Sequence, residues 1–144
     1  MARIKLSLPE NFKFQTTIQV RISDINYGGH VGNDAILSIV HEARLQFLKS
    51  MQYSELDFGG TGLIMADAAI EFKNEAFYND ILTIWVTIAD VQKINFDIFY
   101  KIEKTIDGKT VPVANAKTGM ICFDYEKRKV TAISSLALES IKNV

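Results

Sequence analysis

The pattern of apolar and polar positions predicts the first two elements of this chain. Between residues 14 and 23 apolar and polar side chains alternate, which is typical of a half-buried strand. From Asn33 or Asp34, either of which suits a helix N-cap, apolar residues recur every three or four positions to about Met51. The second pattern predicts one long helix with a broad apolar face packed against a sheet.

Four more stretches read as strands, and they cover residues 63–73, 81–89, 93–106 and 110–125. In the first of these stretches Asp67 and Glu71 fall on the same face as Leu63. The dipeptide Asp107-Gly108 separates the last two stretches and is a strong hairpin signal. A long meander of antiparallel strands is therefore expected after the helix.

The order of elements is one strand, one long helix, four strands and a short C-terminal helix capped by Ser134 or Ser135. No repeat, linker or low-complexity tract interrupts it, so residues 1–144 are expected to form a single domain. The fold class is α+β, with an antiparallel sheet of about five strands wrapped around one helix. One face of such a sheet would stay bare in a monomer, which favours a homo-oligomer, a homodimer or a homotetramer.

Composition narrows the class of protein. Hydrophobic residues make up 48% of the chain, and 16 basic residues face 17 acidic ones, so no net field attracts nucleic acid or anionic lipid. No apolar run approaches membrane-spanning length, and the only cysteine is Cys122. These features predict a cytoplasmic, soluble protein without nucleic-acid or membrane partners.

The turn over residues 24–32 joins the first strand to the long helix and carries the candidate chemistry. Its Gly28-Gly29 pair permits positive φ or close approach to a ligand. Backbone N–H groups near Gly29, and those of Gly32 or Asn33, lie where a helix N-terminus favours negative charge. They are candidate oxyanion donors, although ordinary turn and capping geometry explains the same residues equally well.

Three segments carry a resemblance to a known family. The turn DINYGGHVGN, the helix residues His41-Glu42-Ala43-Arg44 and residues 77–82 are similar, in order and spacing, to motifs of hotdog-fold thioesterases of the 4-hydroxybenzoyl-CoA type. The resemblance covers residues 14–125. It implies a hotdog fold and hydrolysis of an acyl thioester, usually acyl-CoA, at a site between two subunits.

The resemblance also implies roles for the turn residues. Asp24, His30 and Val31 fit the family pattern, but Asn26 stands where the family usually has its catalytic aspartate. An amide cannot act as a general base. We therefore expect Asn26 and His30 to position a water molecule, and Asp24 or a carboxylate from a neighbouring subunit to deprotonate it.

Glu42 is the helix carboxylate that could deprotonate the water from a neighbouring subunit. It lies nine residues past Asn33, roughly 13 Å along a helix, so it is expected to meet the turn of a second subunit and not its own. An ion pair with Lys49 is the simpler explanation of its position. The two histidines, His30 and His41, lack metal-ligand spacing, and no phosphate loop or dinucleotide fingerprint is present, so neither a metal nor a cofactor is expected.

Acyl-CoA thioesterase is thus the leading hypothesis, with CoA and carrier-protein thioesters both open as substrates. A hotdog dehydratase or hydratase ranks low because the "GHFPG" context of those enzymes is absent. A non-catalytic acyl-CoA-binding protein is the third possibility, and the amide at Asn26 is the feature that favours it.

Overall fold

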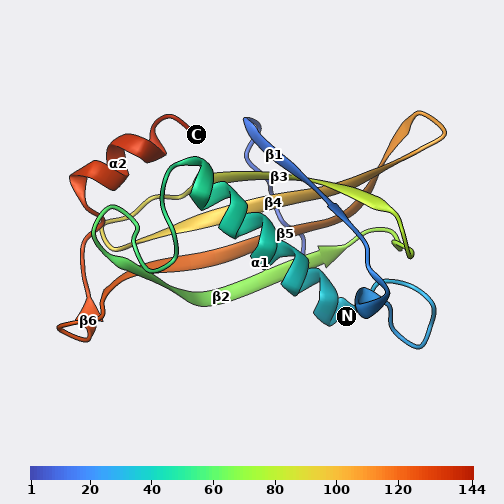
Figure 1. The fold of residues 1–144 in the computed structure, drawn as a ribbon, viewed down its shortest axis with the longest axis horizontal. Coiled ribbons are helices and arrows are strands. Elements are labelled where there is room, and N and C mark those ends of the chain that lie inside the picture. Colours follow the sequence, from blue (N-terminus) through green and yellow to red (C-terminus); the bar gives the residue numbers. More distant parts are fainter.

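The computed structural model describes residues 1–144, and its long helix α1 lies in the concave face of a curved antiparallel sheet (Figure 1). The elements in chain order are β1 (Phe14–Gln19), the 3-10 helix η1 (Ile22–Asp24), α1 (Asn33–Ser50), β2 (Gly62–Phe72), β3 (Ile81–Ala89), β4 (Asn95–Ile106), β5 (Lys109–Asp124), β6 (Lys129–Val130) and α2 (Ser135–Ile141). The strand order is β1-β3-β4-β5-β2, and β6 pairs with β5. This is the predicted α+β hotdog architecture. Neither α1 nor α2 combines the length and the hydropathy that a membrane-spanning helix needs.

The core lies between α1 and the sheet. The helix buries the apolar stripe seen in the sequence: Ile36, Ile39, Val40, Ala43, Phe47 and Leu48. These side chains join a cluster of 26 buried residues from α1, the four strands β2 to β5, α2 and the loops between the elements. At about 1.5–3 kcal/mol per large apolar side chain, such burial holds the helix firmly in one position on the sheet. The N-terminus of α1 is therefore a fixed point in the molecule.

Two turn and capping predictions are confirmed. Asp107 and Gly108 have φ values of 51° and 76°, the left-handed conformation that a two-residue hairpin requires. The Ser134 hydroxyl accepts a hydrogen bond of 3.1 Å from the Ala137 N–H and so caps α2. Local side-chain chemistry determines both features.

A β-bulge in β2 corrects the expected facing of its residues. The register shifts between Met65 and Asp67, so Leu63 points into the core while Asp67 points out of the opposite face. There the Asp67 carboxylate accepts a 2.9 Å hydrogen bond from the Gly119 N–H. One extra residue in a strand moves every later side chain to the other face, and the sequence pattern did not reveal it.

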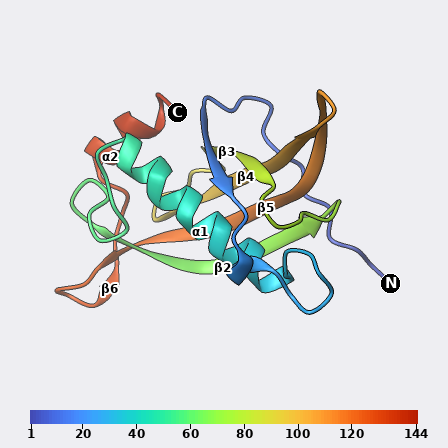
Figure 2. The same cartoon turned by 45° about the vertical axis from the view of Figure 1, so that its right-hand side comes forward.

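The chain's own N-terminal segment crosses the convex face of the sheet, which had been expected to stay bare (Figures 1 and 2). The Leu6 N–H donates to Glu71 Oε1 of β2 at 3.1 Å, and Lys101 Nζ of β4 lies 5.1 Å from the centre of the Phe12 ring. Phe99, which points out of this face and lies outside the core cluster, is only 7% exposed. Because the N-terminal segment covers part of this face, the face does not by itself require a second subunit.

Two carboxylates on the convex face are expected to respond to pH in opposite ways. Burial raises the pKa of Asp97 above its ordinary value despite the attraction of Lys117, and the charges of Asp90 and Asp67 add to the rise. The hydrogen bond from Lys117, 2.9 Å long, lowers the pKa of Asp67. A raised pKa in the folded state means that stability present in acid is lost as pH rises through that pKa, and a lowered pKa means the reverse.

We therefore expect Asp97→Asn to raise the melting temperature at pH 7, and Asp67→Asn to lower it. The Asp97 difference should fade as pH falls through its raised pKa towards the usual aspartate value of about 3.9, whereas the Asp67 difference should fade only below that value. Thermal unfolding of the two variants between pH 3 and 7 is the measurement, and each serves as the matched control of the other. Shifts of the same sign at pH 7 would contradict this account of the cluster.

Candidate active site

The turn between η1 and α1 is closed by its own backbone. The Asn26 N–H donates to the His30 carbonyl at 2.9 Å, and the Gly29 N–H donates to the Asn26 carbonyl at 3.1 Å. Ile25 and Val31 form an isolated antiparallel bridge at its base. Gly29 has a φ of +85°, a conformation that a residue with a side chain rarely adopts. The sequence thus folds this segment into a small rigid loop that ends at the helix.

A buried lysine holds the segment against which this turn packs. The Val31 N–H donates to the Ala76 carbonyl at 2.8 Å. The preceding residue, Glu75, has its carbonyl bound by Lys104 Nζ at 2.7 Å, and the same ammonium lies 3.1 Å from Asp80 Oδ2. Lys104 projects from β4 and is only 6% exposed. The turn is therefore connected to the sheet through a charged and largely dehydrated contact.

Gly32 is the N-cap of α1, and the helix begins at Asn33. The predicted caps were Asn33 and Asp34, so the N-cap lies one residue before the first of them. A glycine offers no side chain to the free N–H groups of the first turn. The Gly32 N–H itself donates to the Asp24 carbonyl at 3.0 Å, as the Gly29 N–H does within the turn. Of the three predicted oxyanion donors, only the N–H of Asn33 has no acceptor in the chain.

His30 shares a groove with Asn33. Both residues line a groove of about 230 Å³ between the start of α1 and the segment after β2. His30 Nδ1 is 3.2 Å from the Val31 carbonyl oxygen, and Nε2 is 4.0 Å from Glu75 Oε1. Because a carbonyl only accepts, Nδ1 carries the proton in the neutral ring, and Nε2, on the side of Glu75, is left as a base.

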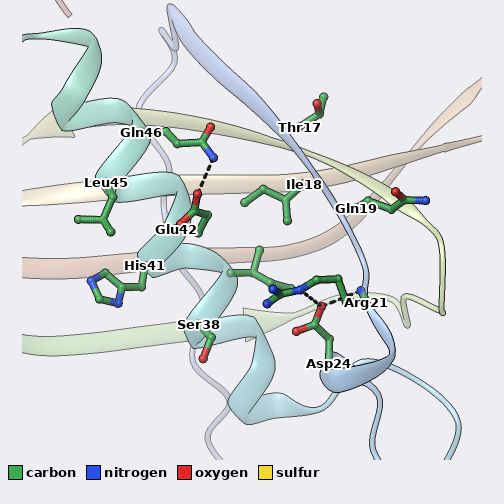
Figure 3. Close-up of a pocket in the computed structure, with 11 residues that line it drawn as sticks. Thr17, Ile18, Gln19, Arg21, Asp24, Ser38, His41, Glu42, Leu45 and Gln46 are labelled. Carbon is green, nitrogen blue, oxygen red and sulfur yellow. Dashed lines mark hydrogen bonds and ion pairs between the residues drawn. The ribbon is translucent and has the colours of Figure 1, made fainter.

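Asp24 and Glu42 lie on the other side of α1. They share a groove of about 470 Å³ between α1 and β1, in which Arg21 and Asp24 face the helix and Gln46 donates to Glu42 Oε1 at 2.8 Å (Figure 3). Glu42 therefore does share a groove with part of its own turn, contrary to the distance estimate. The estimate did not foresee that β1 and η1 lie beside α1, so that one groove along the helix is lined by both Asp24 and Glu42.

The Asp24 side chain already has a structural partner. It is 7% exposed, and its Oδ2 accepts a 2.8 Å hydrogen bond from the Arg21 N–H, which caps η1. Asn26 is also engaged, since its Oδ1 accepts from the Gly28 N–H at 2.9 Å in an Asx-turn. The structure thus places His30 with Asn33 in one groove and Asp24 with Glu42 in another, whereas Asn26 lines neither groove.

Sequence reasoning missed a polar network beneath α1. His41 Nε2 lies 2.8 Å from Glu55 Oε1, and Arg44 Nε donates to Glu55 Oε2 at 3.3 Å. Arg44 Nη1 donates to the Tyr100 hydroxyl at 3.3 Å, and Tyr100 is 2.7 Å from Thr118 Oγ1. Burial raises the pKa of Tyr100, which keeps the phenol neutral. The i,i+3 spacing of His41 and Arg44 was the available signal, but nothing in the sequence pointed to Glu55.

Comparison with known proteins places this architecture in a family. The family model described as "Thioesterase-like superfamily" matches residues 20–141. The structure of a 1,4-dihydroxy-2-naphthoyl-CoA thioesterase from Synechocystis superposes with a TM-score of 0.79 at 25% identity, covering 91% of this chain and 96% of that one.

Two further solved structures share the fold. An aspartate-to-asparagine mutant of 4-hydroxybenzoyl-CoA thioesterase, complexed with 4-hydroxybenzoyl-CoA, gives a TM-score of 0.76 at 18% identity, covering 88% of this chain and 98% of that one. A gentisyl-CoA thioesterase gives 0.74 at 16% identity, covering 89% and 99%. The resemblance seen in the sequence motifs is confirmed, and the chain belongs to the thioesterase-like superfamily with the hotdog fold.

Proposed function

We propose that this protein hydrolyses acyl-CoA thioesters to a free acid and CoA. The observation that carries the proposal is the free N–H of Asn33 at the N-terminus of α1, in one groove with the His30 imidazole. A thioester carbonyl bound there would meet a hydrogen-bond donor and the positive end of the helix dipole. Membership of the thioesterase-like superfamily supports the same reaction.

In this mechanism water attacks the carbonyl carbon while His30 Nε2 accepts its proton. Glu75, 4.0 Å from that nitrogen, stabilises the imidazolium that forms. The Asn33 N–H holds the oxyanion of the tetrahedral intermediate. The intermediate then collapses with cleavage of the C–S bond, and the imidazolium returns the proton to the departing CoA sulfur.

This assignment gives the base to His30, because Asp24 caps η1 and opens into the other groove. A cysteine nucleophile is not part of the mechanism. Cys122 is buried in the core, and burial raises the pKa of its thiol, so the reactive thiolate is disfavoured. Direct attack by water is the chemistry that these residues support.

We further propose that the active form is a homodimer or homotetramer. The exposed side chains of Leu37 of α1 and Met65 of β2 line one groove between the helix and the sheet. A second copy seated there would bury them and bring its own turn near the middle of this helix. Glu42 remains a proposed cross-subunit carboxylate in that arrangement.

The first experiment is thiol release from purified protein with acyl-CoAs that carry short, long and aromatic acyl groups. Aromatic substrates are included because the three solved relatives are named for hydroxylated aryl-CoA thioesters. Turnover of any class supports the proposal. Silence across CoA and carrier-protein thioesters, from folded protein, would overturn hydrolysis.

Replacement of His30 and Asp24 by alanine should separate chemistry from structure. We expect His30→Ala to lower kcat/KM about a hundredfold to ten-thousandfold, since the water loses its base, with little change in stability. Asp24→Ala should mainly lower stability, by about 1 kcal/mol, because a capping hydrogen bond is lost. Steady-state kinetics and urea unfolding of both variants are the measurements. If Asp24→Ala folds normally but has lost turnover, Asp24 and not His30 is the general base.

Binding without turnover is the second candidate function. It is favoured by Asn26, which the family pattern would make an aspartate, and by the asparagine mutant of the related enzyme, whose structure holds its substrate. Equilibrium binding of an acyl-CoA that stays intact over hours would support this alternative. Multiple turnovers would exclude it.

A further inference from the structure

Lys104 occupies a position in β4 where the alternation of the strand predicts an apolar side chain. The residues before it on the same face are all buried in the core: Phe96, Ile98, Tyr100 and Ile102. Lys104 continues this row and is only 6% exposed. A buried ammonium loses its hydration, and its ion pair often adds no more stability than a well-packed apolar side chain would. Stability alone is therefore a poor explanation of a lysine at this position.

The ammonium of Lys104 fixes the loop between β2 and β3 at two points. Its Nζ donates to the Glu75 carbonyl at 2.7 Å and to Asp80 Oδ2 at 3.1 Å, and it lies 4.9 Å from the centre of the Phe77 ring. Asp80 Oδ2 also accepts a 2.8 Å hydrogen bond from the Phe77 N–H, which closes the turn. Residues 75–80 thus fold around one charged group, and the Glu75 peptide cannot turn without breaking a charge-assisted hydrogen bond.

Both ring nitrogens of His30 depend on the backbone of this loop. On one side, the Ala76 carbonyl accepts the Val31 N–H at 2.8 Å, and the Val31 carbonyl oxygen lies 3.2 Å from His30 Nδ1. On the other side, Glu75 Oε1 lies 4.0 Å from Nε2. Lys104 holds the carbonyl of the same Glu75, whose peptide bond leads to Ala76. A shift of this peptide would therefore disturb the partners of His30 on both sides.

We propose that Lys104 is a positioning residue for the hydrolysis: by holding the Glu75 peptide, it keeps the His30 imidazole in the tautomer that leaves Nε2 free to accept a proton. This inference rests on the proposed function, in which His30 is the base. In this role Lys104 contacts neither the substrate nor the attacking water. Because the ammonium acts only through the loop, its loss should reduce kcat and change KM little.

The first test replaces Lys104 by methionine, which has a similar length but neither charge nor donor. We expect Lys104→Met to lower kcat about tenfold to a hundredfold, because small displacements of a reacting group have effects of this size. Lys104→Arg, which keeps the charge and the donors, should recover part of the loss. Lys101→Met is the matched control on the opposite face of β4, where the ammonium lies over the rings of Phe12 and Trp85, and it should keep the wild-type kcat.

The second test observes the tautomer of His30 directly. The chain has only two histidines, His30 and His41, so nitrogen-15 labelling of histidine gives a simple NMR spectrum in which a protonated ring nitrogen differs in chemical shift from a bare one. In the neutral ring of the wild type, Nδ1 of His30 should carry the proton, and Lys104→Met should weaken this preference. His41 is the internal control: its Nε2 lies 2.8 Å from Glu55 Oε1, so it should keep its Nε2–H tautomer in both proteins.

A thermal melt of each variant shows whether it is folded. The Asp80 side chain is 30% exposed and can bind water in place of the ammonium, so Lys104→Met is expected to fold. If it does not, the double variant Lys104→Met/Asp80→Asn takes its place, because it leaves no carboxylate without its partner and keeps an acceptor for the Phe77 N–H.

Wild-type kcat in folded Lys104→Met overturns the inference and leaves hydrolysis intact. A lower kcat with an unchanged His30 tautomer also overturns it, since Lys104 would then act by another route. If the wild type hydrolyses no thioester, yet the His30 tautomer depends on Lys104, the proposed function fails while the link between Lys104 and His30 stands.

Discussion

Replacement of Asn33 by proline is expected to lower kcat by about a hundredfold to a thousandfold while the protein stays folded. Proline has no N–H, so this change deletes the proposed oxyanion donor and leaves the groove in place. The fold should accept it, because Asn33 is the first residue of α1, where proline is favoured. Gly32 before it has φ −71° and ψ 155°, the extended conformation that a residue preceding proline prefers.

The matched control is Asn33→Ala, which removes the side chain and keeps the N–H. We expect it to retain near wild-type kcat. Circular dichroism and a thermal melt of both variants would show that α1 is intact. Wild-type kcat in both variants would place the oxyanion donor elsewhere. An equal loss of kcat in both variants would make the Asn33 side chain the important group.

Glu55→Leu should have the largest effect on stability, a loss of about 3 kcal/mol. The change strands the Arg44 guanidinium, whose side chain is 5% exposed and has no other acidic partner. Arg44→Met should cost less, because Glu55 is 26% exposed and can return to water. Removal of both charges together should restore part of the loss, since neither group is then left buried and unpaired.

Urea unfolding of the two single variants and the double variant measures these differences as a cycle. Glu139→Ala is the control, since Glu139 and Lys142 form a pair with side chains at least 70% exposed and should contribute less than about 1 kcal/mol. A double variant less stable than Glu55→Leu would show that the network contributes net stability.

The architecture could be predicted from the sequence because each element has its own local signal. The three- and four-residue spacing on α1, the alternation in the strands and the Asp107-Gly108 turn all report on neighbouring residues. Features that depend on the pairing of one strand with another could not be predicted from the order of apolar and polar residues. The bulge before Asp67 inserts one residue in β2, and its place is determined by the register with β5.

The candidate site divides in the same way. His30 and Asn33 are close in sequence and were predicted from the turn, whereas their support comes from residues far along the chain. Lys104 lies 29 residues from the Glu75 carbonyl that it binds, and Glu55 meets His41 across a loop. Spacing along one chain cannot indicate such contacts, because folding and not sequence proximity brings them together.

The N-terminal segment has a consequence for local unfolding. This segment is held to the sheet by a 3.1 Å hydrogen bond from the Leu6 N–H and by the contact of the Phe12 ring with Lys101. The strands beneath it are held by many more backbone hydrogen bonds. Segments held by few contacts open before the rest of a protein does. Backbone amides of this stretch should exchange with deuterium early, and a protease should reach Lys5 or Lys13 while the sheet stays folded. Cleavage there would release the contacts of Leu6 with Glu71 and of Phe12 with Lys101 and leave this face of the sheet more open to solvent, without altering the core.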